Sequence, residues 1–148
     1  MNFISESYEL YPEDKCEELV KKGLLEIQKG KVSSALNTFK EIQKFFPNYS
    51  KTHFYLANLY SIQNEKQEAL KSYSLAWEQR EQFEEQEKHY VPYQSIFILL
   101  SMDQIPKYLL KTWIERAEEF YSDYSRNERM TIDFAKQVLQ RKNEEKKE

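Results

Sequence analysis

The chain is 148 residues long, apolar and aromatic residues make up 40% of it, and its 22 Lys and Arg are nearly balanced by 25 Asp and Glu. Such a chain can bury a core without disulfides, and its formal net charge of -3 argues against a strongly basic nucleic-acid-binding protein and a strongly acidic tail. With only 2 Gly and 4 Pro, an all-β sandwich and a glycine-rich phosphate loop are also disfavoured.

The first predicted helix covers residues 17–28, where apolar residues recur at helical spacing. Gly30 is expected to end it, as glycine often does at a helix C-terminus. A second helix is expected over residues 32–46, because its apolar residues are spaced by three and four. Pro47 and Asn48 are expected to stop that helix. The apolar residues of the second stripe are Val32, Ala35, Leu36, Phe39, Ile42 and Phe46.

A second pair of helices, expected over residues 51–62 and 66–79, repeats the first pair at one constant shift along the chain, with a turn at Gln63 and Asn64 between them. The pairs that this shift aligns are Gly23 with Ala57, Ala35 with Ala69, Leu36 with Leu70, Phe39 with Tyr73, and Ile42 with Ala76. The sequence therefore predicts two copies of one antiparallel helical hairpin.

The second half of the chain is less regular. Residues 78–87 are rich in Glu and are expected to extend the preceding helix into solvent, until residues 90–92 break it. Further helices are expected over residues 93–102, 107–121 and 127–141. The first two of these would form a degenerate third hairpin, and the last would be a capping helix with a polar outer face.

The repeated unit resembles the tetratricopeptide repeat (TPR) family, whose consensus combines Leu-Gly, Tyr, an Ala followed four residues later by an aromatic, and a closing Pro. The residues that match are Gly23, Ala35, Phe39 and Pro47 in the first copy, and Leu56, Ala57, Tyr60, Ala69, Tyr73 and Ala76 in the second. The residues that depart from the consensus are Leu19, Lys22, Glu26, His53 and Glu81. The resemblance covers residues 16–83.

This resemblance implies an all-α fold, a short TPR-like helical solenoid with two clear helical hairpins, a degenerate third and a C-terminal capping helix. We expect one domain. Its expected parts are an N-terminal segment (1–15), repeat 1 (16–49), repeat 2 (50–83), a degenerate repeat 3 (90–122), a capping helix (126–142) and a charged tail (143–148).

In TPR proteins the first helix of each repeat lines a concave groove, so the resemblance implies a binding site for a peptide or helix of a partner protein. The groove residues it implies here are Val20, Leu24, Ile27, Lys51, Phe54, Asn58 and Ile62. Burial of the apolar side chains would supply affinity, and Lys51 and Asn58 would fix the register of the ligand. In its apolar character the groove is similar to that of the small TPR chaperones of bacterial type III secretion.

One known partner of the family is not expected. TPR proteins that bind the C-terminal carboxylates of heat-shock chaperones use a Lys and an Asn at positions that correspond here to Val20 and Leu24. Neither of these side chains can donate a hydrogen bond to a carboxylate.

No catalytic, metal-binding or phosphate-binding motif is present. The lone Cys16 cannot form an internal disulfide or a Cys-based zinc site and is interpreted as a small apolar residue. His53 is expected to be packed and His89 solvated. Adjacent Glu residues point about 100° apart on a helix and are interpreted as solvated faces. We therefore expect no enzymatic activity, no cofactor and no metal.

Residues 1–13 lack the basic and apolar regions of a signal peptide, and the longest apolar run, 96–100, is far shorter than the roughly 20 residues of a membrane span. The aromatic residues lie on helix stripes without a basic groove beside them, so they are assigned to the core. The sequence predicts a soluble cytoplasmic protein with neither a nucleic-acid nor a membrane partner.

The expected function is a non-catalytic protein–protein interaction module, acting as a small chaperone or adaptor. One alternative is a structural subunit of a homo- or hetero-oligomeric assembly that uses the same surfaces, and a second is an enzyme built around Cys16. The groove has several candidate occupants: a partner segment, a second copy of the chain, the chain's own N-terminal segment, or the degenerate third hairpin curled inward over it. That N-terminal segment contains Phe3, Ile4, Tyr8, Leu10 and Tyr11.

Overall fold

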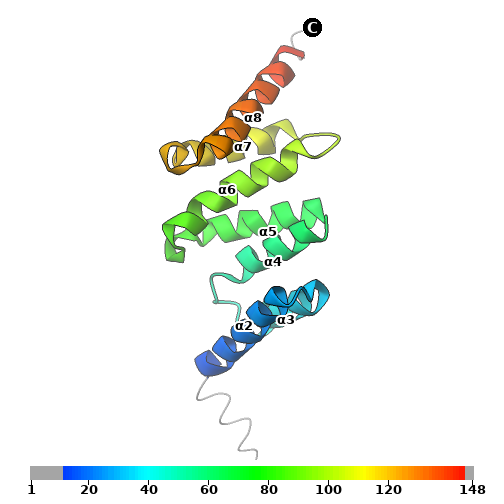
Figure 1. The fold of residues 1–148 in the computed structure, drawn as a ribbon, viewed down its shortest axis with the longest axis vertical. Helices are drawn as coiled ribbons and strands as arrows, with labels where there is room; N and C mark the ends of the chain where they lie inside the picture. The colour runs from blue at the N-terminus through cyan, green and yellow to red at the C-terminus, as the bar shows by residue number, and fades with distance from the viewer. Residues whose placement is uncertain (1–11, 146–148) are drawn as a thin grey trace, which may run out of the picture. The chain divides into compact units, whose positions relative to one another are not determined.

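The computed structural model describes residues 12–145, and over that range every regular element is a helix (Figure 1). The expectation of an all-α fold is therefore confirmed. The chain forms two compact units, one ending at Gln79 and the other beginning at Arg80. None of the described helices combines the length and the apolar character that a membrane span requires.

The first unit contains four helices: α2 (Pro12–Gln28), α3 (Val32–Phe45), α4 (Thr52–Ile62) and α5 (Lys66–Glu78). Each helix packs against the next one in the chain. The ends agree with the predicted ones to within a few residues, except that α2 begins at Pro12 rather than at residue 17. Proline is well suited to the first turn of a helix, because it has no backbone N–H that would need a partner there.

The two hairpin connections of the first unit repeat each other at the shift that the sequence predicts. Gly30 and Asn64 occupy equivalent positions, and their φ angles are 75° and 61°. The backbone hydrogen bonds around them are also equivalent: Lys29 to Leu25, Gly30 to Ile27 and Lys31 to Glu26 in the first connection, and Gln63 to Leu59, Asn64 to Ser61 and Glu65 to Tyr60 in the second. The repeat inferred from apolar positions is thus also present in the backbone.

A close approach of α2 and α3 depends on Gly23. A β-carbon at this position would lie 2.6 Å from Cε2 of Phe39. The Phe39 ring is fully buried and stacks on Tyr55 of α4, with 4.8 Å between ring centroids. Ala35 and Ala69, which the repeat aligns, are also fully buried. The shared small and aromatic positions therefore form the core of the first unit, as the repeat predicts.

The second unit contains three α-helices among the residues that the structure describes: α6 (Glu85–Leu100), α7 (Lys107–Glu118) and α8 (Arg126–Glu145). Two short 3-10 turns, η1 (Arg80–Gln82) and η2 (Tyr121–Asp123), precede α6 and α8. Each of the three α-helices packs against the other two.

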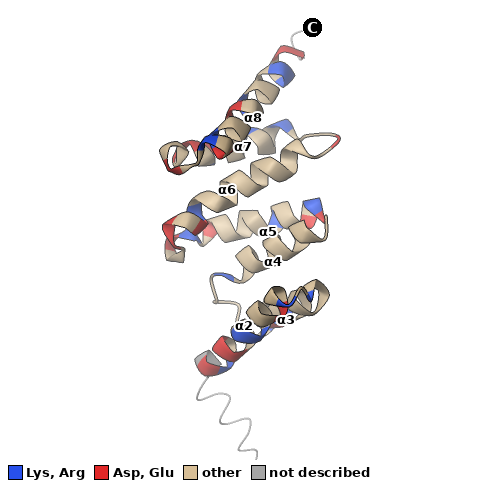
Figure 2. Ribbon diagram, in the orientation of Figure 1, with Lys and Arg blue, Asp and Glu red and all other residues tan. Residues whose placement is uncertain are grey.

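The predicted extension of α5 through the Glu-rich residues 78–87 is wrong. α5 ends at Glu78, and a new helix begins at Glu85, where acidic residues gather (Figure 2). The Glu87 carboxylate accepts a hydrogen bond from the backbone N–H of Glu84 at 2.9 Å. This contact satisfies a backbone donor at the start of the helix, so part of the acidic run starts a helix rather than prolonging one.

The predicted break at residues 90–92 is also wrong, because Pro92 lies inside α6. A proline deprives the carbonyl four residues earlier of its helical donor and distorts that turn. In the same turn the hydroxyl of Tyr124 donates a hydrogen bond to the carbonyl of His89 at 2.5 Å. Pro92 is itself buried. Packing and a donor from outside the helix therefore accompany the proline, and the third helix pair begins earlier than residue 90.

The last helix only partly matches the expectation of a polar outer face. Ser125 and Glu128 cap its start reciprocally, since each side chain accepts a hydrogen bond from the other residue's backbone N–H. Charged residues follow along α8 (Figure 2). Met130 and Phe134, one turn apart, nevertheless have exposed fractions of 59% and 49%. The outer face of α8 is therefore interrupted by large apolar side chains.

Candidate functional site

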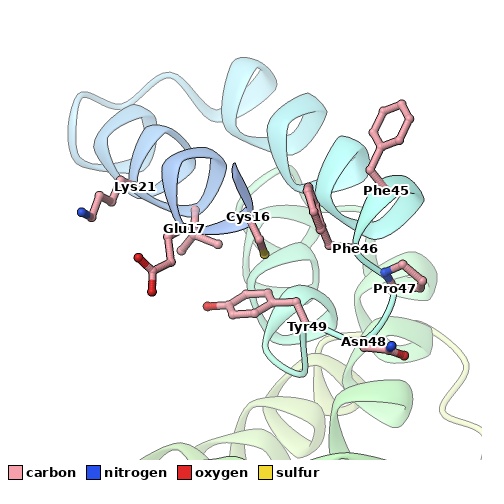
Figure 3. Close-up of a pocket in the computed structure, with 9 residues that line it drawn as sticks. Cys16, Glu17, Lys21, Phe45, Phe46, Pro47, Asn48 and Tyr49 are labelled. Atoms are coloured by element: carbon pink, nitrogen blue, oxygen red, sulfur yellow. The ribbon is translucent and has the colours of Figure 1, made fainter. Parts of the chain in front are cut away.

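A pocket of about 700 Å³ opens in the first unit, between the first turns of α2 and the connection from α3 to α4 (Figure 3). Pockets that hold ligands in proteins have volumes of about 300–1,000 Å³. The lining residues are Cys16, Glu17, Val20 and Lys21 on α2, and Phe45, Phe46, Pro47, Asn48 and Tyr49 on the other side. Most of these side chains are apolar or aromatic, and two opposite charges come from α2.

The aromatic side chains face the pocket in different ways. Phe46 and Tyr49 lie beside Cys16, whereas the ring of Phe45 projects outward (Figure 3). Phe45 has an exposed fraction of 60%, and Lys44 lies over its ring. Phe46 and Tyr49 are half-buried and pack against the core of the unit. The pocket thus has a fixed inner wall and an outer edge that presents a large apolar side chain to solvent.

Hydrogen bonds of the α3–α4 connection hold this wall in place. The backbone N–H of Phe46 bonds to the carbonyl of Ile42, and that of Tyr49 to the carbonyl of Phe46 at 3.1 Å. The hydroxyl of Thr52 then donates to the carbonyl of Tyr49, also at 3.1 Å. Pro47 cannot continue α3, because proline lacks the backbone donor. The chain therefore leaves the helix at a fixed point and passes along the start of α2.

Cys16 shows no sign of activation as a nucleophile. Burial and, to a smaller extent, the neighbouring Glu17 carboxylate raise the pKa of the Cys16 thiol. Because the thiolate is the reactive form of cysteine, a raised pKa lowers its reactivity at neutral pH. Neither His53 nor His89 lines the pocket. The pocket offers shape and apolar surface for binding.

The predicted groove residues of α2 are placed in two environments. Val20 lines the pocket and packs against the core of the unit. Ile27 is half-buried and also packs against that core. Leu24 has an exposed fraction of 39% and lies outside the pocket. Of the seven residues that the TPR resemblance implies, only Val20 contributes to the pocket.

The predicted groove residues of α4 and its start are spread over surface and core. Phe54 is buried, with an exposed fraction of 8%, whereas that of Ile62 is 63%. Asn58 is half-buried and accepts a hydrogen bond from the hydroxyl of Tyr73 on α5 at 2.5 Å. Lys51 is half-buried at the start of α4. Their role in binding stays a prediction, and the pocket lies next to α2 instead.

Sequence reasoning missed residues 45–49 as part of a site. Two signals were present: adjacent Phe45 and Phe46 cannot both face the core of one helix, and an aromatic residue follows shortly after the helix-stopping Pro47. The expectation treated this stretch only as the end of a helix. Its position beside α2 follows from the packing of the hairpin rather than from local pattern.

Other polar groups of the described chain form structural contacts. Tyr121 donates a hydrogen bond to Asp133 at 2.8 Å, and Lys136 pairs with Glu118. The expectation of a solvated His89 is wrong, because this half-buried ring lies against Phe120 and Tyr124. These groups therefore hold the helices of the second unit together.

His53 is half-buried, in agreement with the prediction of a packed side chain, and burial lowers its pKa, an effect that Glu78 partly opposes. The adjacent Glu pairs lie on the surface; they are Glu17–Glu18, Glu84–Glu85, Glu118–Glu119 and Glu144–Glu145. Across residues 12–145, no group of His, Cys, Asp and Glu side chains is arranged to hold a metal ion.

No protein-family model matches the sequence, and comparisons with curated proteins and with solved structures find no match.

Proposed function

We propose that this protein is a non-catalytic protein–protein interaction module of the TPR-like class, and that its first unit binds an apolar segment of a partner protein. The equivalence of the hairpin connections at Gly30 and Asn64 supports the TPR-like arrangement. Their separation matches the period of about 34 residues that is typical of that family. The acceptor site is the pocket between α2 and residues 45–49.

The observation that carries the proposal is the apolar character of this pocket together with its exposed edge. Val20, Phe46 and Tyr49 form the inner surface, and Phe45 stands 60% exposed beside it. An apolar hollow rimmed by polar residues is typical of an interaction site. Aromatic side chains can each bury about 150–250 Å² on contact with a partner, so a few anchors would supply most of the affinity.

The charges at the rim restrict the partner further. Glu17 and Lys21 are exposed and lie one helical turn apart on α2. A segment with apolar anchors and both an acidic and a basic residue near them would complement this rim. Rim charges mainly set the association rate and the specificity, whereas the apolar anchors set the affinity.

The test is selection of binders from a library of random peptides, followed by affinity measurements on purified variants. The pocket variant is Val20→Thr/Phe45→Ser, which keeps the size of residue 20 and changes an exposed residue. The matched control is Leu24→Ser/Leu25→Ser, because both leucines lie on α2 outside the pocket, with exposed fractions of 39% and 49%. Circular dichroism establishes that both variants keep their helices.

We expect enriched peptides with aromatic or branched apolar residues, whose affinity falls about tenfold or more in the pocket variant, corresponding to about 1.4 kcal/mol, and stays unchanged in the control. Equal loss in both variants would favour the wider groove that includes Leu24. Failure to enrich any peptide, or unchanged affinity in the pocket variant, would refute the pocket as the binding site.

A further inference from the structure

The pocket opens beside the point where the chain enters α2. Cys16 lines the pocket and lies four residues after Pro12, the first residue of the helix, which corresponds to about 6 Å along the helix axis. Residues 1–11, which lie outside the described range, are therefore covalently joined to one wall of the pocket. We propose that this N-terminal segment is the intramolecular occupant of the pocket and competes with the partner.

The segment is long enough to fold back from Pro12 and reach the pocket. An extended chain spans at most about 3.3–3.6 Å per residue, so residues 1–11 have a reach of about 36–40 Å. The distance from Pro12 to Cys16 is a small part of that reach. A tether this short places its apolar residues near the pocket at an effective concentration in the millimolar range.

The apolar character of the segment matches that of the lining. Six of its residues are large and apolar or aromatic: Met1, Phe3, Ile4, Tyr8, Leu10 and Tyr11. Its side-chain charges are acidic, from Glu6 and Glu9; they complement Lys21 on the pocket wall, whereas Glu17 on the same wall has no basic counterpart among the side chains of the segment. The chain itself therefore supplies apolar anchors with a nearby acid. The stretch between residues 4 and 12 is long enough for the chain to reverse its direction and bring these anchors to the pocket.

This inference rests on the proposed function, since it assigns a resident ligand to the same pocket. A partner would then bind only to the fraction of molecules whose pocket is open, and its apparent affinity would be lowered by that fraction. The segment would compete with the partner for the apolar wall of the pocket.

Cys16 makes this occupancy measurable, because it is the only cysteine in the sequence and lines the pocket. The experiment measures the rate at which a thiol reagent labels Cys16 in the full chain. The test variant is Phe3→Ser/Ile4→Ser, and the matched control is Asn2→Ser/Ser7→Asn, which changes two polar residues of the same segment. Rates are taken at pH 7 and pH 9, so that a change in access is separated from a change in thiol ionisation.

If the segment occupies the pocket nine-tenths of the time, labelling is about tenfold faster in the test variant at both pH values. The control should label at the wild-type rate. A synthetic peptide of residues 1–11 should slow labelling of the test variant, and the same peptide with both serine substitutions should not. Equal rates in all three chains, or equal acceleration in variant and control, would overturn the proposal.

The outcomes separate this proposal from the function it rests on. If peptides bind in a way that depends on Val20 and Phe45 while Cys16 labelling is unchanged, the proposed interaction module is supported. The proposal that the N-terminal segment occupies the pocket is then refuted. Accelerated labelling in the test variant without any enriched peptide would show a segment that covers the pocket and would count against partner binding there.

Discussion

The close contact between Gly23 and Phe39 makes a prediction that runs against helix propensity. Alanine is favoured over glycine in a helix by about 1 kcal/mol, so Gly23→Ala would stabilise an exposed helix. Here the added β-carbon would lie 2.6 Å from Cε2 and 2.9 Å from Cζ of Phe39. Carbon atoms do not approach so closely, and the fully buried Phe39 ring is held against Tyr55.

The size of the effect follows from two opposing contributions. Overpacking of a well-packed contact costs about 1–3 kcal/mol, and the gain in propensity offsets about 1 kcal/mol of that. We therefore expect Gly23→Ala to lower the free energy of unfolding by up to about 2 kcal/mol. In the double variant Gly23→Ala/Phe39→Leu the ring that would clash with the added β-carbon is absent. Its loss of stability should therefore be smaller than the sum of the losses in the two single variants, by about 0.5–3 kcal/mol.

The assay is urea unfolding followed by the fluorescence of Trp77, in a Trp113→Phe background. Trp77 lies on α5 in the first unit and Trp113 on α7 in the second, so the signal reports on the unit that contains Gly23. Lys22→Ala, at an exposed position of the same helix, is the control and should change stability by less than about 0.5 kcal/mol. A stabilisation of about 1 kcal/mol by Gly23→Ala would refute the described packing of α2 on α3.

Three further predictions concern other contacts. Ala69→Leu should destabilise the first unit by about 1–3 kcal/mol in urea unfolding, because Ala69 is fully buried; a neutral result would contradict the register of the repeat. Tyr124→Phe removes the hydrogen bond to the His89 carbonyl and should lower the free energy of unfolding by about 1 kcal/mol. This loss is measured as a lower thermal midpoint, and an unchanged midpoint would show that the bond does not support α6. Burial lowers the pKa of His53, although Glu78 opposes this; the unfolded chain therefore takes up a proton first as the pH falls below about 6.5, and stability should decrease there. His53→Gln should flatten that slope in unfolding measured between about pH 6.5 and pH 5, and an unaltered slope would exclude His53 as its source.

The hairpins of the first unit could be predicted because their signals are local. Gly30 and Asn64 tolerate the positive φ that each connection requires, and the small residues that allow close helix packing recur at the same spacing. These features act within one hairpin, so a single sequence shows them twice. Gly23 was recognised as a repeat position, although the ring that it accommodates became evident only in the structure.

The errors in the second half have tertiary causes. A proline in a sequence favours a break, but Pro92 lies within α6. In the same turn the hydroxyl of Tyr124, 35 residues after His89, donates a hydrogen bond to the His89 carbonyl. The Glu-rich run could be assigned to solvent by composition, whereas the contact between Glu84 and Glu87 depends on where the new helix begins. The pocket was missed for a similar reason, since its two walls meet only after α2 and α3 have packed.

Binding of an apolar segment in the pocket beside the start of α2 can be followed residue by residue with amide chemical-shift mapping. A selected peptide is titrated into the isotopically labelled full chain, and the shift of each backbone amide is recorded. We predict the largest shifts at Cys16, Val20, Phe46 and Tyr49, with those of α8 unchanged. Shifts confined to the exposed face of α8 around Met130 and Phe134, or the absence of any localised shift, would contradict this prediction.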